Sequence, residues 1–228
     1  MSAADALTGR RARAADSEYR CFAALGDSFT AGVPDPVTGH VPTGKRWADL
    51  VAEALRRRNP ALEHRNLAVA GASSREVIEG QITPTAALHP DLLTLFCGAN
   101  DVLLSTRPDV PEYAAALSAA FAQLRAELPE AELLTATCPD LSGWVDFGPR
   151  TRERVRRGIA ELNEATRTVA ADHGVGCLEF ANHPWAGRRE SFAADGVHPS
   201  REGHQAVAAA FLGALSKRPA PRTIGARS

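Results

Sequence analysis

Five short apolar segments, separated by stretches of helical periodicity, constrain the fold of this chain more than any other feature. The segments are CFAAL, HRNLAVA, DLLTLFCG, AELLTAT and VGCLEF, which begin at residues 21, 64, 91, 131 and 175. The first shows no alternation of apolar and polar residues, which is typical of a strand buried on both faces. Strands that alternate with amphipathic helices predict an α/β protein with a five-stranded parallel sheet. The helices are expected within residues 46–58, around Val77 and Ile78, and within 111–128, 150–174 and 201–215.

The chain is expected to form one domain. Its 228 residues suffice for one α/β domain with a full core, and no repeat or low-complexity linker divides them. We expect this domain to span residues 19–217. The flanking segments 1–18 and 218–228 are rich in Ala, Arg, Pro and Gly, and we expect them to be flexible arms.

The composition excludes several classes of protein. The 26 basic residues are balanced by 27 acidic ones, so no global field favours nucleic acid or an anionic membrane. The four cysteines, Cys21, Cys97, Cys138 and Cys177, lie in or beside predicted strands and have no metal-ligand spacing. No apolar stretch reaches the length of a signal peptide or a membrane span. We therefore expect a soluble, cytoplasmic protein without a metal or another cofactor.

Polar residues with catalytic chemistry follow the predicted strands. Ser28 follows the first strand, Gly71 the second and Asn100 the third, and the loop after the fifth contains Asp195 and His198. The carboxyl ends of parallel strands meet at one edge of a sheet, so these residues are expected to converge there. A hydroxyl, an imidazole, a carboxylate and nearby N–H donors are the groups that serine-based acyl transfer requires.

Each of these groups has an expected role. His198 can take the proton of the Ser28 hydroxyl near neutral pH, and Asp195 can fix the imidazole orientation. A backbone carbonyl could orient His198 instead of Asp195. The oxyanion of a tetrahedral intermediate could be bound by the backbone N–H groups of Ser28 and Gly71 and by the side-chain amide of Asn100.

The motifs GDSFTAG, AVAGASS, GAND and DGVHPS resemble, in order, the four sequence blocks of the SGNH (GDSL-type) hydrolases. The letters of that name correspond to Ser28, Gly71, Asn100 and His198. The resemblance spans residues 21–215 and implies a flavodoxin-like, three-layer α/β/α fold that hydrolyses esters or thioesters without a metal. Phe29 replaces the leucine of the family name, and we expect it to affect the pocket wall rather than the chemistry.

The resemblance leaves the substrate and one choice of function open. A small-molecule ester or thioester with a short or medium acyl group is expected, and no nucleic acid or membrane partner. Transfer of the acyl group to a small metabolite or carrier-bound acceptor is an alternative, as is a flavodoxin-like protein that binds a ligand without catalysis. Residues 33–46 and 138–150 are expected to line the pocket. Trp144 and Trp185, in loops after strands, are expected either to form pocket walls or only to pack at the surface.

Several other residues near the motifs have simpler interpretations. Asp27 and Asp101 are expected to hold their loops through bonds from side chain to backbone. His204 is expected to pack or to cap a helix, and Cys97 to belong to the core. The arginines between positions 150 and 157 are interpreted as a solvated helix face, because no aromatic residues that could stack on bases accompany them.

Overall fold

The computed structural model describes residues 19–33 and 45–217. The expected arms 1–18 and 218–228, and most of the expected pocket loop 33–46, lie outside these residues. The described part contains a five-stranded parallel sheet with the strand order β2-β1-β3-β4-β5. The strands are β1 (Cys21–Gly26), β2 (Glu63–Asn66), β3 (Leu92–Phe96), β4 (Glu132–Ala136) and β5 (Gly176–Leu178). This confirms the predicted parallel α/β architecture.

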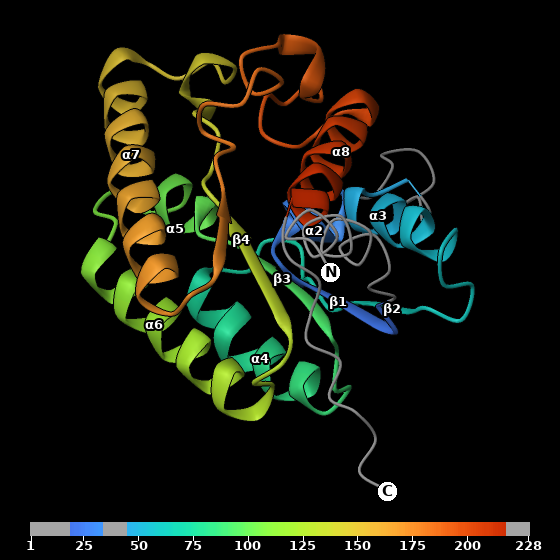
Figure 1. The fold of residues 1–228 in the computed structure, drawn as a ribbon. Helices are drawn as coiled ribbons and strands as arrows, with labels where there is room; N and C mark the ends of the chain where they lie inside the picture. Colours follow the sequence, from blue (N-terminus) through green and yellow to red (C-terminus); the bar gives the residue numbers. More distant parts are fainter. Residues whose placement is uncertain (1–18, 34–44, 218–228) are drawn as a thin grey trace, which may run out of the picture.

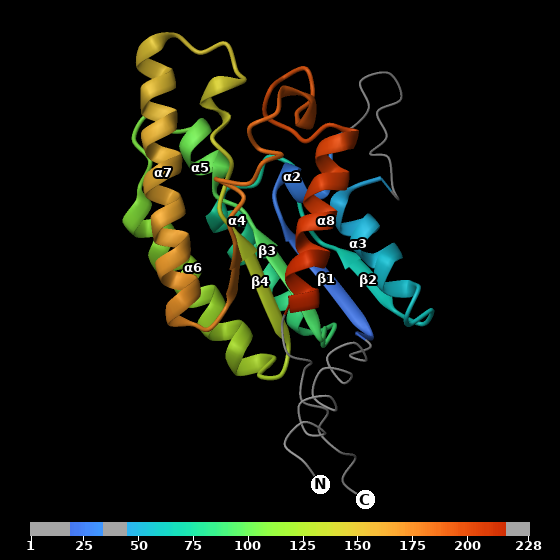
Figure 2. The same cartoon turned by 45° about the horizontal axis from the view of Figure 1, so that its top comes forward.

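Helices cover both faces of the sheet, so that the molecule has three layers (Figures 1 and 2). One face carries α3 (Trp47–Arg56) and α8 (Arg201–Lys217), and the other carries α4 (Ser74–Ala86), α6 (Val110–Glu127) and α7 (Pro149–Asp172). Short helical segments stand at the ends of strands or in loops: α2 (Ser28–Ala31), α5 (Ala99–Leu103), and the 3-10 helices η1 (Leu141–Gly143) and η2 (Arg189–Ser191).

The central strand β3 is apolar along nearly its whole length because both of its faces are covered by helices. Leu93 and Leu95 pack with α4, α6 and α7, whereas Leu92 and Phe96 pack with α3 and α8. All four side chains are buried, since successive residues of a strand point to opposite faces and helices cover both. Burying an apolar side chain of this size contributes about 1.5–3 kcal/mol, so the strand stabilises both layers.

Strands β2 and β5 are shorter than the sequence pattern predicts. The run 64–70 was expected to be one strand, but β2 ends at Asn66, whose side-chain oxygen accepts a hydrogen bond from the N–H of Ala68 (3.1 Å). Beyond Asn66 the N–H groups of Leu67 and Val69 still donate to the Ala24 and Gly26 carbonyls (2.9 and 3.0 Å), so this run stays beside β1 although regular strand ends. Similarly, β5 ends at Leu178 because the Phe180 N–H donates back to the Leu178 carbonyl (3.0 Å).

The end of β1 is held in place by contacts that only glycine permits. Gly26 has φ = +146°, and a Cβ atom there would collide with the carbonyl oxygen of Phe96 on β3. The buried amide of Gln81 on α4 accepts a hydrogen bond from the Gly26 N–H and donates one to its carbonyl, both at 2.9 Å. The start of the following turn, which contains Ser28, is therefore fixed against two neighbouring elements.

Candidate active site

The loops that contain the predicted site residues meet at the carboxyl edge of the sheet. Ser28 is the first residue of α2, and Asn100 lies in α5; in Figure 2 both helices lie at the end of the sheet where the chain enters α8. Gly71 lies between β2 and α4, and Asp195 and His198 precede α8. The structure thus brings all five predicted residues to one edge, as expected for ligand sites of parallel sheets.

Ser28, His198 and Asp195 form a chain of hydrogen bonds. The Nε2 atom of His198 lies 2.9 Å from Ser28 Oγ, and its Nδ1 atom lies 2.7 Å from Asp195 Oδ2. An ionised carboxylate only accepts, so Nδ1 carries the proton and donates it to Asp195. In the neutral ring Nε2 is then free to accept the hydrogen bond of the Ser28 hydroxyl, which is the arrangement a general base requires.

The loop that contains Asp195 is built to hold this carboxylate in one orientation. Asp195 Oδ1 accepts from the backbone N–H groups of Val197 (2.9 Å) and His198 (3.1 Å). Partial burial acts to raise the pKa of Asp195, but hydrogen bonds from the His198 side chain and from both N–H groups outweigh it and lower the pKa. Gly196 has φ = +72°, and a Cβ there would collide with the Trp144 carbonyl, so the loop lies directly on the 141–144 segment.

Three N–H donors beside Ser28 have capacity to bind an oxyanion. Among the described residues, the backbone N–H groups of Ser28 and Gly71 have no protein acceptor. Asn100 Nδ2 donates to the Ala72 carbonyl (2.9 Å), which fixes which end of the amide is the NH2 group. That group has a second hydrogen for which the described residues provide no acceptor.

Asp27 is buried directly beside the serine. Burial raises the pKa of its carboxyl to about 6, although the hydrogen bond from the Phe29 N–H (3.0 Å) and the charge of His198 act in the opposite direction. The bond to Phe29 caps the short helix α2 and orients the Ser28 backbone. This is the bond from side chain to backbone that the sequence predicted for Asp27.

A small apolar hollow adjoins Ser28, Asn100 and His198. It has a volume of about 20 Å³ and is lined mainly by apolar side chains of four different loops. A volume of this size holds one water molecule, or a methyl group of similar size. The lining residues are Asp27, Ser28, Phe29, Phe96, Ala99, Asn100, Leu103, Cys138, Pro139, Leu141, Val197 and His198.

A larger open cleft begins on the other side of Asn100. It has a volume of about 750 Å³, starts at Gly71 and Asn100, and extends along residues of α4, α5 and α6. Five carboxylates and two guanidinium groups line it, so it is polar and acidic. These charged residues are Glu76, Glu79, Asp101, Asp109 and Glu112, and Arg75 and Arg107.

The aromatic residues near the site mostly support its walls. Phe29 lines the hollow and packs edge-on against Phe96, with ring centroids 4.8 Å apart. Its place in the wall is the one expected for this departure from the family name. Trp185 is buried behind Phe29 at a centroid distance of 6.3 Å, and neither it nor Trp144 lines the hollow. Neither interpretation holds for Trp185, which belongs to the core rather than to the pocket wall or the surface.

Other predicted residues have structural roles. His204 accepts the N–H of Trp47 at Nδ1 (3.2 Å), which caps the start of α3, and burial lowers the pKa of its ring to about 4. Cys97 is buried, which raises the pKa of its thiol well above the usual value, and it belongs to the core as predicted. Asp101 accepts two hydrogen bonds from Ser74, one of them from the backbone, as expected.

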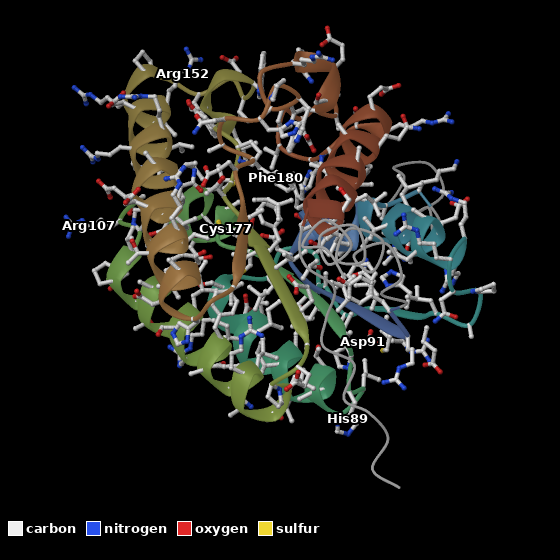
Figure 3. The ribbon with its side chains drawn as sticks, in the orientation of Figure 1. His89, Asp91, Arg107, Arg152, Cys177 and Phe180 are labelled. Atoms are coloured by element: carbon white, nitrogen blue, oxygen red, sulfur yellow. The ribbon has the colours of Figure 1, made fainter. Side chains whose placement is uncertain are left out.

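The arginine cluster at the start of α7 faces solvent for the most part. Arg150, Arg152, Arg156 and Arg157 are exposed, and Figure 3 shows Arg152 projecting from the helix away from the body of the protein. Arg154 is the exception, because it folds back and donates to the carbonyls of Val102 and Ser105 near α5.

The expected pocket loop 138–150 contributes Cys138, Pro139 and Leu141 to the hollow. The sequence did not identify Leu103, which lies in a short helical turn whose apolar side chains give no periodic pattern. In the described ranges 19–33 and 45–217, three or more His, Cys, Asp or Glu side chains do not gather in a group that could bind a metal. Within the same ranges, every helix is too short or too polar to cross a membrane.

Comparison with protein families now adds to this geometry. The model of the GDSL-like lipase/acylhydrolase family matches residues 24–206, a segment that contains every site residue described above. The chain belongs to this family. The resemblance of its four motifs is thereby confirmed, and with it the class of enzyme, a hydrolase of esters. No curated protein matches the chain.

Solved structures of a lipase/acylhydrolase and of two esterases share the fold. A lipase/acylhydrolase from Enterococcus faecalis aligns with a TM-score of 0.70 and 23% identity, covering 90% of this chain and 99% of the other. Axe2, an acetylxylan esterase from Geobacillus stearothermophilus, aligns with a TM-score of 0.66 and 20% identity, covering 90% and 97%. The esterase EstA from Pseudoalteromonas sp., inhibited by monoethylphosphonate, aligns with a TM-score of 0.65 and 16% identity, covering 87% and 97%.

Proposed function

We propose that this GDSL-like hydrolase cleaves carboxylic esters of short acyl groups through an acyl-enzyme intermediate on Ser28. The observation that carries the proposal is the continuous chain from Ser28 Oγ through His198 to Asp195, with bonds of 2.9 and 2.7 Å. In this mechanism His198 Nε2 takes the Ser28 proton while Oγ bonds to the ester carbonyl carbon. The same proton then passes from Nε2 to the leaving alcohol, whose bond to the carbonyl carbon breaks.

The second half of the cycle uses the same groups. Water loses a proton to His198 Nε2 as its oxygen bonds to the acyl carbon, and the proton returns to Ser28 Oγ when the acid leaves. In both halves the carbonyl oxygen carries negative charge, which the Ser28, Gly71 and Asn100 N–H groups stabilise. Asp195 keeps the ring in the tautomer that both steps require and stabilises its positive charge.

The hollow of about 20 Å³ supports a small acyl group. The acyl group stays bonded to Ser28 while the alcohol leaves, and a larger alcohol leaves more readily through the open cleft than through the narrow hollow. We therefore assign the acyl group to the hollow and the alcohol to the open cleft. A hollow with room for one methyl-sized group fits an acetyl ester. The structural neighbour Axe2 is an acetylxylan esterase, and an acetyl group has the size that this hollow would accept.

The charge of the cleft supports an ester over a thioester of an anionic carrier. Five carboxylates against two guanidinium groups repel a phosphate-bearing leaving group and tolerate a neutral or cationic alcohol. No feature of the described residues favours transfer to an acceptor other than water, and the complete set of catalytic groups argues against a protein that only binds a ligand.

The test combines turnover with labelling. Purified protein should hydrolyse p-nitrophenyl acetate, and the Ser28→Ala variant, which keeps the fold, should lose this activity. A fluorophosphonate probe, chemically related to the phosphonate that inhibits EstA, should label one peptide, the one that contains Ser28. Labelling of a different residue, or undiminished turnover by Ser28→Ala, would refute the assignment.

A further inference from the structure

Two of the proposed oxyanion donors follow strands that are not neighbours in the sheet. Gly71 follows β2 and Asn100 follows β3, and β1 separates these two strands. Backbone hydrogen bonds join the loop after β2 to β1 as far as Val69, whose N–H donates to the Gly26 carbonyl (3.0 Å), but Gly71 lies beyond this bond. The relative position of the two donors depends on contacts between the loops above β1.

Packing does not hold Gly71 in place. A Cβ atom built on this residue would find no atom within 4 Å, and the neighbouring Val69 side chain is 56% exposed. The backbone of Gly71 also has φ = +84°, a conformation that glycine can leave easily. The position of its N–H must be set by the residues that flank it.

Two sets of hydrogen bonds connect those flanking residues to α5. Asn100 Nδ2 donates to the Ala72 carbonyl (2.9 Å), directly after Gly71. Two residues further, Ser74 donates both its backbone N–H (2.9 Å) and its hydroxyl (2.6 Å) to the two carboxylate oxygens of Asp101. Ser74 is 3% exposed and is the first residue of α4, where the helix dipole favours a carboxylate.

We propose that Asp101 is a positioning residue that, through Ser74, keeps the Gly71 and Asn100 donors at the spacing one oxyanion requires. The proposal rests on the function proposed above. Asp101 is next to Asn100 in the sequence, so the short helix α5 contains both the Asn100 donor and the carboxylate that holds Ser74, directly after the loop of the Gly71 donor. When this carboxylate is lost, the hydrogen bond from Asn100 to Ala72 still joins the loop to α5 and the bond from the Val69 N–H to the Gly26 carbonyl (3.0 Å) still joins it to β1, but both bonds from Ser74 are gone.

The expected effect is on turnover rather than on substrate binding. Misplacement of a catalytic group by about 1 Å can cost on the order of 10²-fold. We expect Asp101→Ala to lower kcat by about 10- to 100-fold and to change KM less, because the donors bind more strongly as charge develops. Asp101→Asn keeps an acceptor for the Ser74 N–H and should fall between wild type and alanine.

A matched control is available at the opposite end of the sheet. Asp91 also accepts two backbone N–H groups, those of Arg20 (2.8 Å) and Cys21 (3.0 Å), and Figure 3 shows it near the start of β3. Asp91→Ala removes equivalent bonds without touching the site. It should lower the melting temperature while kcat remains at the wild-type value. A kcat loss in Asp91→Ala as large as in Asp101→Ala would overturn the positioning role.

The decisive experiment is a double-mutant cycle of Asp101→Ala with Asn100→Ala, measured with p-nitrophenyl acetate. If Asp101 acts on the donors that Asn100 also positions, the two substitutions should not multiply: the factor that Asp101→Ala costs in kcat should differ by at least about 3-fold between the wild-type and the Asn100→Ala backgrounds. The same factor in both backgrounds would overturn the proposal. Ser28→Ala is measured in parallel. If it loses activity, the proposed function stands and the cycle tests only the role of Asp101, whereas retained activity would overturn the proposed function itself.

Discussion

Replacing Asn100 by alanine and by aspartate distinguishes an oxyanion donor from a residue that only orders its loop. Asn100 has one observed partner, the Ala72 carbonyl, and one remaining N–H that is proposed to face the developing charge. Loss of the first bond affects stability, and loss of the second affects turnover. The two effects have different magnitudes and are measured separately.

The magnitudes follow from the contacts. A hydrogen bond such as that to Ala72 contributes about 1 kcal/mol, which for a domain of this size corresponds to about 2–4 °C in melting temperature. Removing one oxyanion donor costs about 10²–10³ in kcat, or about 2.7–4 kcal/mol. Asn100→Ala should therefore be folded, slightly less stable and strongly impaired.

Aspartate is the sharper probe because its size and shape match asparagine. At neutral pH its carboxylate would replace a donor with a charge of the same sign as the oxyanion, and it would face the Ala72 carbonyl without a proton to donate. Asn100→Asp should therefore lose more activity than Asn100→Ala, with KM changing less than kcat.

The assay is steady-state hydrolysis of p-nitrophenyl acetate together with thermal unfolding of the same preparations. A folded Asn100→Asp enzyme with near wild-type kcat would refute the reasoning. The reasoning would also be refuted if both variants lost kcat equally and in proportion to their fall in melting temperature, because a residue that only orders its loop gives that pattern.

Three further predictions test neighbouring features. The raised pKa of Asp27, about 6 in the folded protein against 3.8, means that this carboxyl lowers stability as pH rises through that interval. The free energy of unfolding of Asp27→Asn, measured in urea, should exceed that of wild type by up to about 3 kcal/mol at pH 8 and differ little from it at pH 4. Equal gains in stability at both pH values would contradict this. The kcat/KM of wild type should be at least about 10-fold higher for the acetyl than for the butyryl ester of p-nitrophenol. Leu103→Ala, which widens the hollow, should reduce this ratio, and an unchanged ratio would argue against the acyl site. EDTA should leave turnover unchanged, because Ser28, His198 and Asp195 supply the activated nucleophile themselves, and loss of activity that a divalent ion restores would refute this.

The parts of the fold that the sequence predicted correctly are those with a simple periodic cause. Runs such as LLTLF are buried on both faces and can only be central strands, and helix α7 shows a clear apolar stripe. The ends of strands were predicted less well. Asn66 is the last residue of β2 and its side chain also accepts the N–H of Ala68, and periodicity does not report where such a local bond ends a strand.

The site was predictable to a similar degree. Ser28, Asn100 and His198 each stand after a predicted strand or within a recognisable motif, so topology placed them together. The residues that shape the hollow were predicted only in part. Leu141 lies in the expected loop 138–150, whereas Leu103 comes from α5, and only the folded chain brings it to the same hollow. The bond between Asp101 and Ser74 likewise joins segments 27 residues apart in sequence.

The pairing of Ser28 with His198 joins residues 170 positions apart, and this separation has a consequence for synthesis of the protein. The serine leaves the ribosome early, directly after β1, whereas the imidazole arrives in the last loop before the final helix. Contacts so distant in sequence form late, since the intervening chain must first be ordered. A nascent chain therefore exposes an unactivated hydroxyl until α8 packs beside α3. The appearance of hydrolytic activity during translation would mark the docking of this last loop and of α8, after β5 has been made.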